Sequence, residues 1–79
     1  MDDVYILSYV VWKRLGDGCR PRMVDCGING IFSTKDNAID YLVRGWPEAL
    51  YDPERDDYCL ELENNCYARY RIRYERLVY

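Results

Sequence analysis

The sequence predicts a single α+β domain, residues 1–79, in which an antiparallel four-stranded sheet carries one helix on one face in the order β-β-α-β-β. Three observations favour this fold. A chain of 79 residues has room for one hydrophobic core. Only one segment repeats its apolar residues at the helical period, and segments rich in β-branched and aromatic residues flank it on both sides.

The first strand is predicted at Val4–Trp12, which contains many β-branched and aromatic residues and neither Gly nor Pro. Its apolar residues alternate as Val4, Ile6, Val10 and Trp12 on one face and Tyr5, Leu7, Tyr9 and Val11 on the other. Apolar residues on both faces indicate a central strand. Since one helix covers only one face, we expect the Tyr5 set, if it lies opposite the helix, to form an interface with a partner or a second copy.

A wide loop over residues 13–22 leads to the second strand, predicted at about Met23–Phe32 with a bulge near Gly27 and Gly30. Ser33 is the expected N-cap of the helix, with Asp36 three residues later. The helix has an apolar stripe at Ala38, Ile39, Leu42, Val43 and Trp46, a possible cap at Gly45, and a stop at Pro47. Residues 48–57 are expected to form a loop, apart from an initial helical turn.

The last third is predicted to be a hairpin of Tyr58–Glu63 and Ala68–Val78. A two-residue turn would place the apolar residues of the two strands on opposite faces, which is strongly disfavoured. A three-residue loop, Asn64–Cys66, aligns the faces and allows an Asn to adopt the left-handed conformation. This register places Leu60 opposite Tyr70, Leu62 opposite Ala68, Glu61 opposite Arg69 and Cys59 opposite Arg71.

Composition argues against an enzyme. The chain contains no His, and therefore no imidazole base or His-containing metal site, and its Gly-Asp-Gly segment lacks the context of a phosphate-binding loop. We expect no catalytic residues, no cofactor and no metal. The four cysteines have spacings unlike those of zinc sites, so free thiols are the first expectation, with a disulfide or a metal as alternatives. No segment resembles a membrane span or a signal peptide, which predicts a location in the cytoplasm, including that of a host cell.

Charge divides the chain into unequal parts. Residues 48–65 have a net charge of −6, whereas the whole chain has a net charge of −3. We predict a partner-binding surface made of Glu48, Tyr51, Asp52, Glu54, Asp56, Asp57, Tyr58, Glu61 and Glu63. Such a surface would attract a basic site on another protein. A solvated loop whose carboxylates pair with nearby arginines explains the same pattern without a partner. A divalent metal site is a further alternative, but this segment lacks the Gly and the distal Glu of a calcium-binding loop.

The final segment, residues 66–79, has a net charge of +3 and places Arg69, Arg71 and Arg73 on one strand face. Arginines beside tyrosines could contact phosphates and bases, as in single-strand binding platforms. The acidity of the whole protein and the facing glutamates rank direct nucleic-acid binding below protein contact.

Two segments resemble a group of very small uncharacterised bacterial and phage proteins: V-Y-I-L-S-Y at residues 4–9 and G-I-F-S-T-K-D-N-A-I at residues 30–39. The likeness covers about half of the chain, and the long Arg-Tyr final strand departs from it. In size, acidity and lack of catalytic groups, the chain is also similar in type to phage anti-defence proteins, including anti-CRISPR proteins. That resemblance implies a stoichiometric inhibitor and assigns no individual residues.

The leading hypothesis from the sequence is therefore a non-enzymatic inhibitor. Its acidic, tyrosine-rich surface would bind a basic, nucleic-acid-handling defence protein of a bacterial host and mimic or block nucleic acid. The alternative hypothesis is a small nucleic-acid-binding domain that uses Arg69, Arg71 and Arg73. The chain could act as a monomer or as a homodimer.

Overall fold

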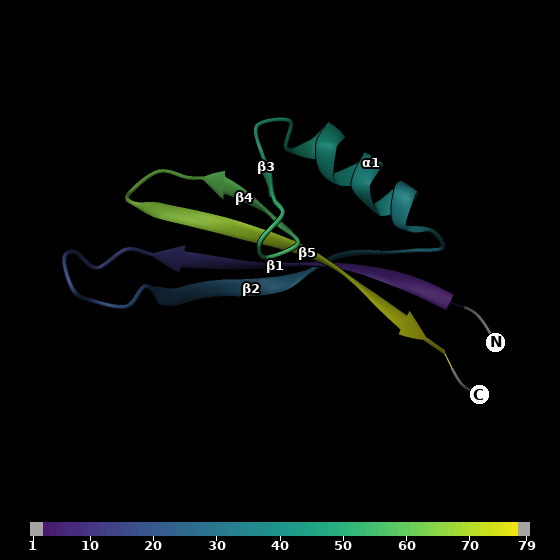
Figure 1. Cartoon of the computed structure of the whole chain (residues 1–79), viewed down its shortest axis with the longest axis horizontal. Helices are drawn as coiled ribbons and strands as arrows, with labels where there is room; N and C mark the ends of the chain where they lie inside the picture. The colour runs from purple at the N-terminus through teal and green to yellow at the C-terminus, as the bar shows by residue number, and fades with distance from the viewer. Residues whose placement is uncertain (1–2, 78–79) are drawn as a thin grey trace.

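The computed structural model describes residues 3–77, which form one helix and one five-stranded antiparallel sheet (Figure 1). The elements are β1 Asp3–Lys13, β2 Arg22–Phe32, α1 Lys35–Gly45, β3 Leu50–Asp52, β4 Asp57–Glu61 and β5 Cys66–Arg76. In space the strands follow the order β2-β1-β5-β4-β3. The α+β class is confirmed. The predicted count of four strands and the order β-β-α-β-β are wrong, because β3 lies between α1 and β4.

The strand β3 falls where the sequence predicts a loop. It contains only three residues, which is too short for an alternating pattern, and Pro53 follows it directly. Pairing with β4 creates this strand: Tyr51 lies opposite Tyr58, and their ring centroids are 5.2 Å apart. The contact with β4, and not the strand propensity of its own residues, therefore determines the structure of β3.

The central position predicted for the first strand is confirmed, because β1 pairs with β2 on one side and β5 on the other. Its Leu7 side chain is fully buried in the core with Leu42 of α1. The set on the face that α1 covers is therefore Tyr5, Leu7, Tyr9 and Val11, so this set does not form an exposed patch on the far face. Since side chains alternate along a strand, Val4, Ile6, Val10 and Trp12 lie on the face away from the helix.

The predicted irregularity in the second strand is confirmed. The register between β1 and β2 shifts twice, which leaves Asn29 and Val24 as the extra residues of β2. Gly27 leaves space for an aromatic ring on the helix-covered face: a Cβ there would lie 2.9 Å from the Cε1 atom of Tyr9. The absence of a side chain at this position thus allows the Tyr9 ring to lie across β2.

The helix begins one residue later than the sequence indicates. Its N-cap is Thr34, whose hydroxyl accepts a hydrogen bond from the backbone N–H of Asn37 at 3.1 Å, so the prediction of Ser33 is wrong. At the other end, the N–H of Trp46 caps the helix on the carbonyl of Leu42 at 2.8 Å. Of the predicted apolar stripe, Ala38 and Leu42 are fully buried, Ile39 and Trp46 are half-buried, and Val43 is exposed.

Four residues, numbers 62–65, connect β4 to β5, and not the predicted three-residue loop Asn64–Cys66. The N–H of Leu62 donates to the carbonyl of Cys66 at 2.9 Å and so extends the hairpin by one pair. Asn64 and Asn65 have φ values of 59° and 62°, which confirms the left-handed conformation expected there. Leu60 therefore lies opposite Ala68 and Cys59 opposite Arg69, two residues away from the predicted register. An even shift leaves every side chain on its predicted face. The predicted strand end, Val78, lies outside the described residues.

The core beneath α1 is small and is formed by Leu7, Leu42, Leu60, Ala68 and Tyr70. The ring of Trp46 extends it over Tyr70, with the ring centroids 4.9 Å apart. An 11-residue helix is only about 16 Å long, whereas the molecule extends over 47 Å. Figure 1 shows α1 on one side of the sheet only. In residues 3–77, no helix covers the other side, which we call the open face.

Candidate functional site

The open face carries two kinds of side chain in neighbouring strands. On β5 it presents every second residue, a set that includes Arg69, Arg71 and Arg73. On β1 it presents the apolar set that contains Trp12. The paired positions are Val4 with Glu75, Ile6 with Arg73, Ser8 with Arg71, Val10 with Arg69, and Trp12 with Tyr67. The predicted arginines Arg69, Arg71 and Arg73 thus lie on one face, and that face is the one the helix leaves open.

Two adjoining hollows, of about 360 Å³ and 390 Å³, follow this row of arginines. We call the two together the arginine groove. Its lining consists of Ser8, Tyr9, Val10, Trp12, Arg20, Pro21, Arg55, Asp57, Tyr67, Arg69, Arg71 and Arg73. The two hollows share Trp12, Arg55 and Arg69. Five arginines face one carboxylate, so the lining has a net charge of +4 in a chain whose net charge is −3.

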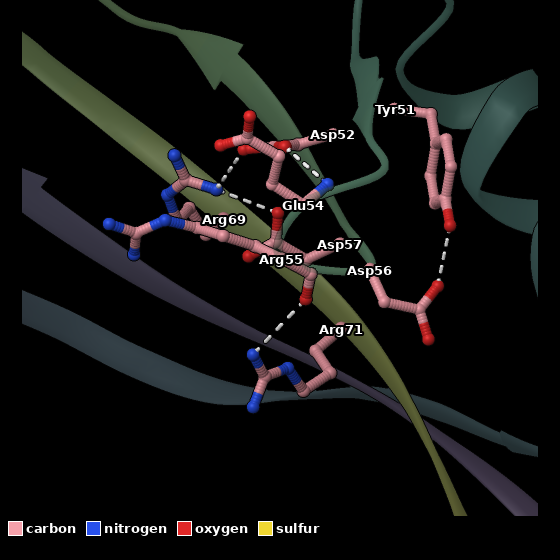
Figure 2. A network of polar contacts seen from close by, with 8 residues as sticks. All are labelled: Tyr51, Asp52, Glu54, Arg55, Asp56, Asp57, Arg69 and Arg71. Carbon is pink, nitrogen blue, oxygen red and sulfur yellow. Dashed lines mark hydrogen bonds and ion pairs between the residues drawn. The ribbon is translucent and has the colours of Figure 1, made fainter.

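Arg55 reaches the groove from the connection between β3 and β4. An ion pair holds this connection against β5, because Arg69 Nη1 donates to Asp57 Oδ1 at 2.7 Å and to Asp52 Oδ2 at 3.4 Å (Figure 2). Arg71 Nη2 also donates to the backbone carbonyl of Arg55 at 3.5 Å. In Figure 2 the side chains of Arg55 and Arg69 point the same way, and both line the two hollows.

The arginines of the groove differ in how far their charges are compensated. Arg69 is largely neutralised, because its side chain is 21% exposed and its main partner, Asp57, is 5% exposed. Burial by itself lowers the pKa of Arg69, but the neighbouring charges, that of Asp57 first, and the hydrogen bond to Asp52 together outweigh burial, so the pKa is raised and the arginine stays charged. Arg73 has an exposed partner in Glu75 at 3.1 Å. Among the described side chains, no carboxylate forms an ion pair with Arg20, Arg55 or Arg71.

The structure divides the predicted acidic surface between two faces. Asp52, Asp57 and Glu61 lie on the open face, where they bind arginines; Glu61 receives both of its hydrogen bonds from Arg14, at 2.7 and 3.1 Å. Tyr51 and Tyr58 lie on the helix side of the sheet.

The remaining acidic residues also differ in their surroundings. Asp56 accepts a hydrogen bond from the Tyr51 hydroxyl at 2.7 Å. This bond, together with partial burial, raises the pKa of Tyr51. Glu48, Glu54 and Glu63 are exposed and form no ion pair within residues 3–77. The nine predicted residues therefore do not form one continuous surface.

Sequence reasoning missed three residues of the groove. Trp12 was expected on one face of β1, but only the position of the helix shows which face is open. Arg55 is the single basic residue of the acidic segment, residues 48–65, and Arg20 lies in the loop after β1. Neither residue belongs to the alternating pattern of the β5 arginines. No local signal marks either residue, because the contacts that bring them to the groove span long stretches of chain.

A separate, smaller hollow of about 210 Å³ lies between α1 and the β3–β4 hairpin. Its lining is Lys35, Ile39, Tyr51, Asp56, Tyr58 and Ile72. The four cysteines are free thiols, of which Cys19 and Cys26 are exposed. Within residues 3–77, no group of three or more Cys, Asp or Glu is placed to hold a metal ion.

The fold and the groove define a small α+β domain with a cationic, aromatic sheet face. No protein-family model matches the chain, and neither the curated proteins nor the solved structures contain a significant match to it. Among residues 3–77, no helix has the length and apolar character needed to cross a membrane.

Proposed function

We propose that this protein is a nucleic-acid-binding domain that acts without catalysis and uses the arginine groove as its binding site. The observation that carries this proposal is the lining of the groove, which combines five arginines and one carboxylate with Trp12 and Tyr67. Guanidinium groups bind phosphate oxygens in a planar, bidentate manner, and aromatic rings offer faces on which bases stack.

The energetics of the groove support an anionic ligand. Arg55, Arg69 and Arg71 lie beside one another, and only Arg69 has a close carboxylate partner among the described residues. Like charges held together destabilise a fold unless a counter-ion or a ligand offsets their repulsion. A chain of phosphates offsets this repulsion at several positions at once, and its binding releases counter-ions.

The inhibitor hypothesis, with an acidic surface inside a bacterial host cell, remains a prediction and has less support. Asp52, Asp56 and Asp57 are bound to groups of the chain itself, so they are less available to a partner protein. The exposed residues Glu48 and Glu54 are still available for such a contact. The low ranking of nucleic acid rests on two grounds. The net charge of −3 does not describe the charge of the groove, and the register places Cys59 opposite Arg69 and Glu61 opposite Tyr67, so no glutamate of β4 lies directly opposite Arg69.

Fluorescence anisotropy with labelled oligonucleotides at 50–200 mM salt tests the proposal. We expect binding that weakens as salt rises, with a slope that reports the number of phosphates neutralised. Arg55→Ala and Arg71→Ala should each weaken binding and reduce the slope by about 0.7–0.9. Arg44→Ala is the matched control, because Arg44 is exposed on α1 and pairs there with Asp40. We leave Arg69 unchanged, since its ion pair supports the fold.

The proposal fails if neither single-stranded nor double-stranded DNA or RNA binds at 50 mM salt. It also fails if Arg44→Ala weakens binding as much as Arg71→Ala does, since binding would then follow net charge and not the groove. Circular dichroism of each variant confirms that the fold is retained.

A further inference from the structure

We infer that the arginine groove selects single-stranded nucleic acid, with the phosphates along β5 and the bases on an apolar strip across β1 and β2. This inference rests on the proposed nucleic-acid-binding function and names the form of nucleic acid that the site takes. Two observations carry it: the position of the exposed apolar residues of β2 relative to the arginines, and the spacing of the rows that they form together.

The apolar strip begins on the edge strand β2, which β1 separates from the arginines of β5. Ile28 and Ile31 are each 62% exposed, and Met23 is 53% exposed. The register places these side chains on the open face. Ile31 is paired with Ile6, Ile28 with Ser8, and Met23 with Trp12. Exposed apolar side chains that gather in this way on a small domain mark a binding surface.

Pairing through β1 joins each of these residues to one of β5. Four rows therefore cross the open face, namely Ile31–Ile6–Arg73, Ile28–Ser8–Arg71, Cys26–Val10–Arg69 and Met23–Trp12–Tyr67. Within a row the strands are about 4.8 Å apart, so the apolar end lies roughly 10 Å from the β5 end. In the first three rows the β5 end is an arginine. A nucleotide has the same polarity, with a charged phosphate at one end and a flat base at the other.

The spacing of the rows favours an extended strand. Successive residues on one face of a strand are about 6.8 Å apart, whereas stacked nucleotides in a duplex advance about 3.4 Å. A strand that places one nucleotide on each row must therefore be unstacked. Such a strand exposes base faces to Trp12 and to the apolar strip, whereas a duplex buries them and leaves the strip in water.

Trp12 provides a direct measurement of this contact. The protein has two tryptophans, and Trp46 packs on Tyr70 beneath the helix, away from the groove. Titration with unlabelled oligo-dT at 50 mM salt should quench the emission of Trp12 as a base stacks on its ring. Trp12→Phe should show no quenching and should still display the emission of Trp46. The same titration with inorganic polyphosphate, which has charge but no bases, should leave the emission unchanged.

Affinity measurements test the apolar strip. Trp12→Ala should weaken single-strand binding by about fivefold or more, the loss expected for one stacked base. Ile28→Ser should weaken it in the same direction without changing the salt slope, because no charge is removed. Val43→Ser is the matched control, since Val43 is 49% exposed on α1. A duplex of the same sequence should bind more weakly than the single strand.

The outcomes separate this inference from the proposed function. Equal affinity for duplex and single strand, without quenching of Trp12, overturns the inference and leaves the proposed nucleic-acid binding intact. Absence of binding to both overturns the two together. Binding to vesicles of anionic lipid, with no binding to oligonucleotides, would assign the cationic groove and its apolar strip to a membrane surface and also overturns both.

Discussion

Arg69 Nη1 lies 2.7 Å from Asp57 Oδ1, and this ion pair joins β5 to the acidic segment, residues 48–65. The side chain of Asp57 is 5% exposed and that of Arg69 is 21% exposed, so water screens the pair poorly. The pair therefore affects both the fold and the surface that is available for binding. It fixes the connection that carries Arg55, and it removes Asp57 from any surface that a partner protein could use.

Removal of one partner of this pair should destabilise the fold. Arg69→Ala leaves the Asp57 carboxylate buried without its main partner, so we expect a loss of about 3 kcal/mol in the free energy of unfolding. Urea denaturation followed by circular dichroism measures this loss.

Two further variants give this prediction its controls. Arg44→Ala removes an exposed pair and should change stability by less than about 0.5 kcal/mol. Replacement of both partners, as in Asp57→Leu with Arg69→Met, should recover much of the loss, because apolar pairs often replace buried ion pairs without penalty. A loss below 1 kcal/mol in Arg69→Ala would show that the pair contributes little.

The two glycines Gly27 and Gly45 should respond in opposite ways to alanine. A Cβ at Gly27 would lie 2.9 Å from Cε1 and from the hydroxyl of Tyr9, so the ring must move and its hydrogen bond to Asp25 is strained. We expect Gly27→Ala to destabilise the fold by about 1–3 kcal/mol.

Gly45 is the matched control for that substitution. It is the last residue of α1 and has open space around its Cα. Gly45→Ala should leave stability unchanged or raise it by up to about 1 kcal/mol. Thermal unfolding of the two variants in one buffer measures the difference. Equal melting temperatures would contradict the contact between Tyr9 and β2.

Stability should fall in alkaline solution because several tyrosine pKa values are raised in the folded state. The charge of Asp25 raises the pKa of Tyr9, a hydrogen bond to Asp3 raises that of Tyr74, and burial raises that of Tyr70. A raised pKa means that the folded state holds the proton more tightly than the unfolded state does. The stabilisation is therefore complete below the ordinary tyrosine value of 10.0 and is lost as pH rises through the folded values.

Urea midpoints at pH 8, 9, 10 and 11 measure this loss, with tyrosinate absorbance as the record of ionisation. We expect a constant midpoint up to about pH 9 and a decline above it. Tyr74→Phe removes one contributing hydroxyl and should flatten the decline. A midpoint that rises between pH 9 and pH 11 would contradict the direction of these pKa shifts.

Charge reversal at the exposed glutamates separates the two functional hypotheses. Replacing Glu48, Glu54 and Glu63 by lysine changes the net charge from −3 to +3 without touching a described ion pair. If the groove binds nucleic acid, the variant should bind oligonucleotides more tightly at low salt. If the acidic segment binds a basic protein, capture of that protein from the host should be lost. An unchanged oligonucleotide affinity would count against electrostatic attraction to the groove.

The elements that local pattern determines were predictable. The dense β-branched run of β1 and the apolar stripe of α1 each follow from neighbours in the sequence, and both were found. The alternation of Arg69, Arg71 and Arg73 placed these residues on one face for the same reason. The strand β3 was not predictable, since three residues have no period of their own.

The sequence by itself determined which side chains share a face, because a strand alternates with a period of two whatever lies around it. Only the tertiary structure decided which face of β1 contacts Leu42 and which face stays open. Both faces of β1 are apolar, so the helix could cover either of them. It also decided that Arg55 and Trp12 line one groove although they are far apart in the chain. Net charge is a sum over residues, whereas binding depends on where the charges lie, and the folding of the chain sets their positions.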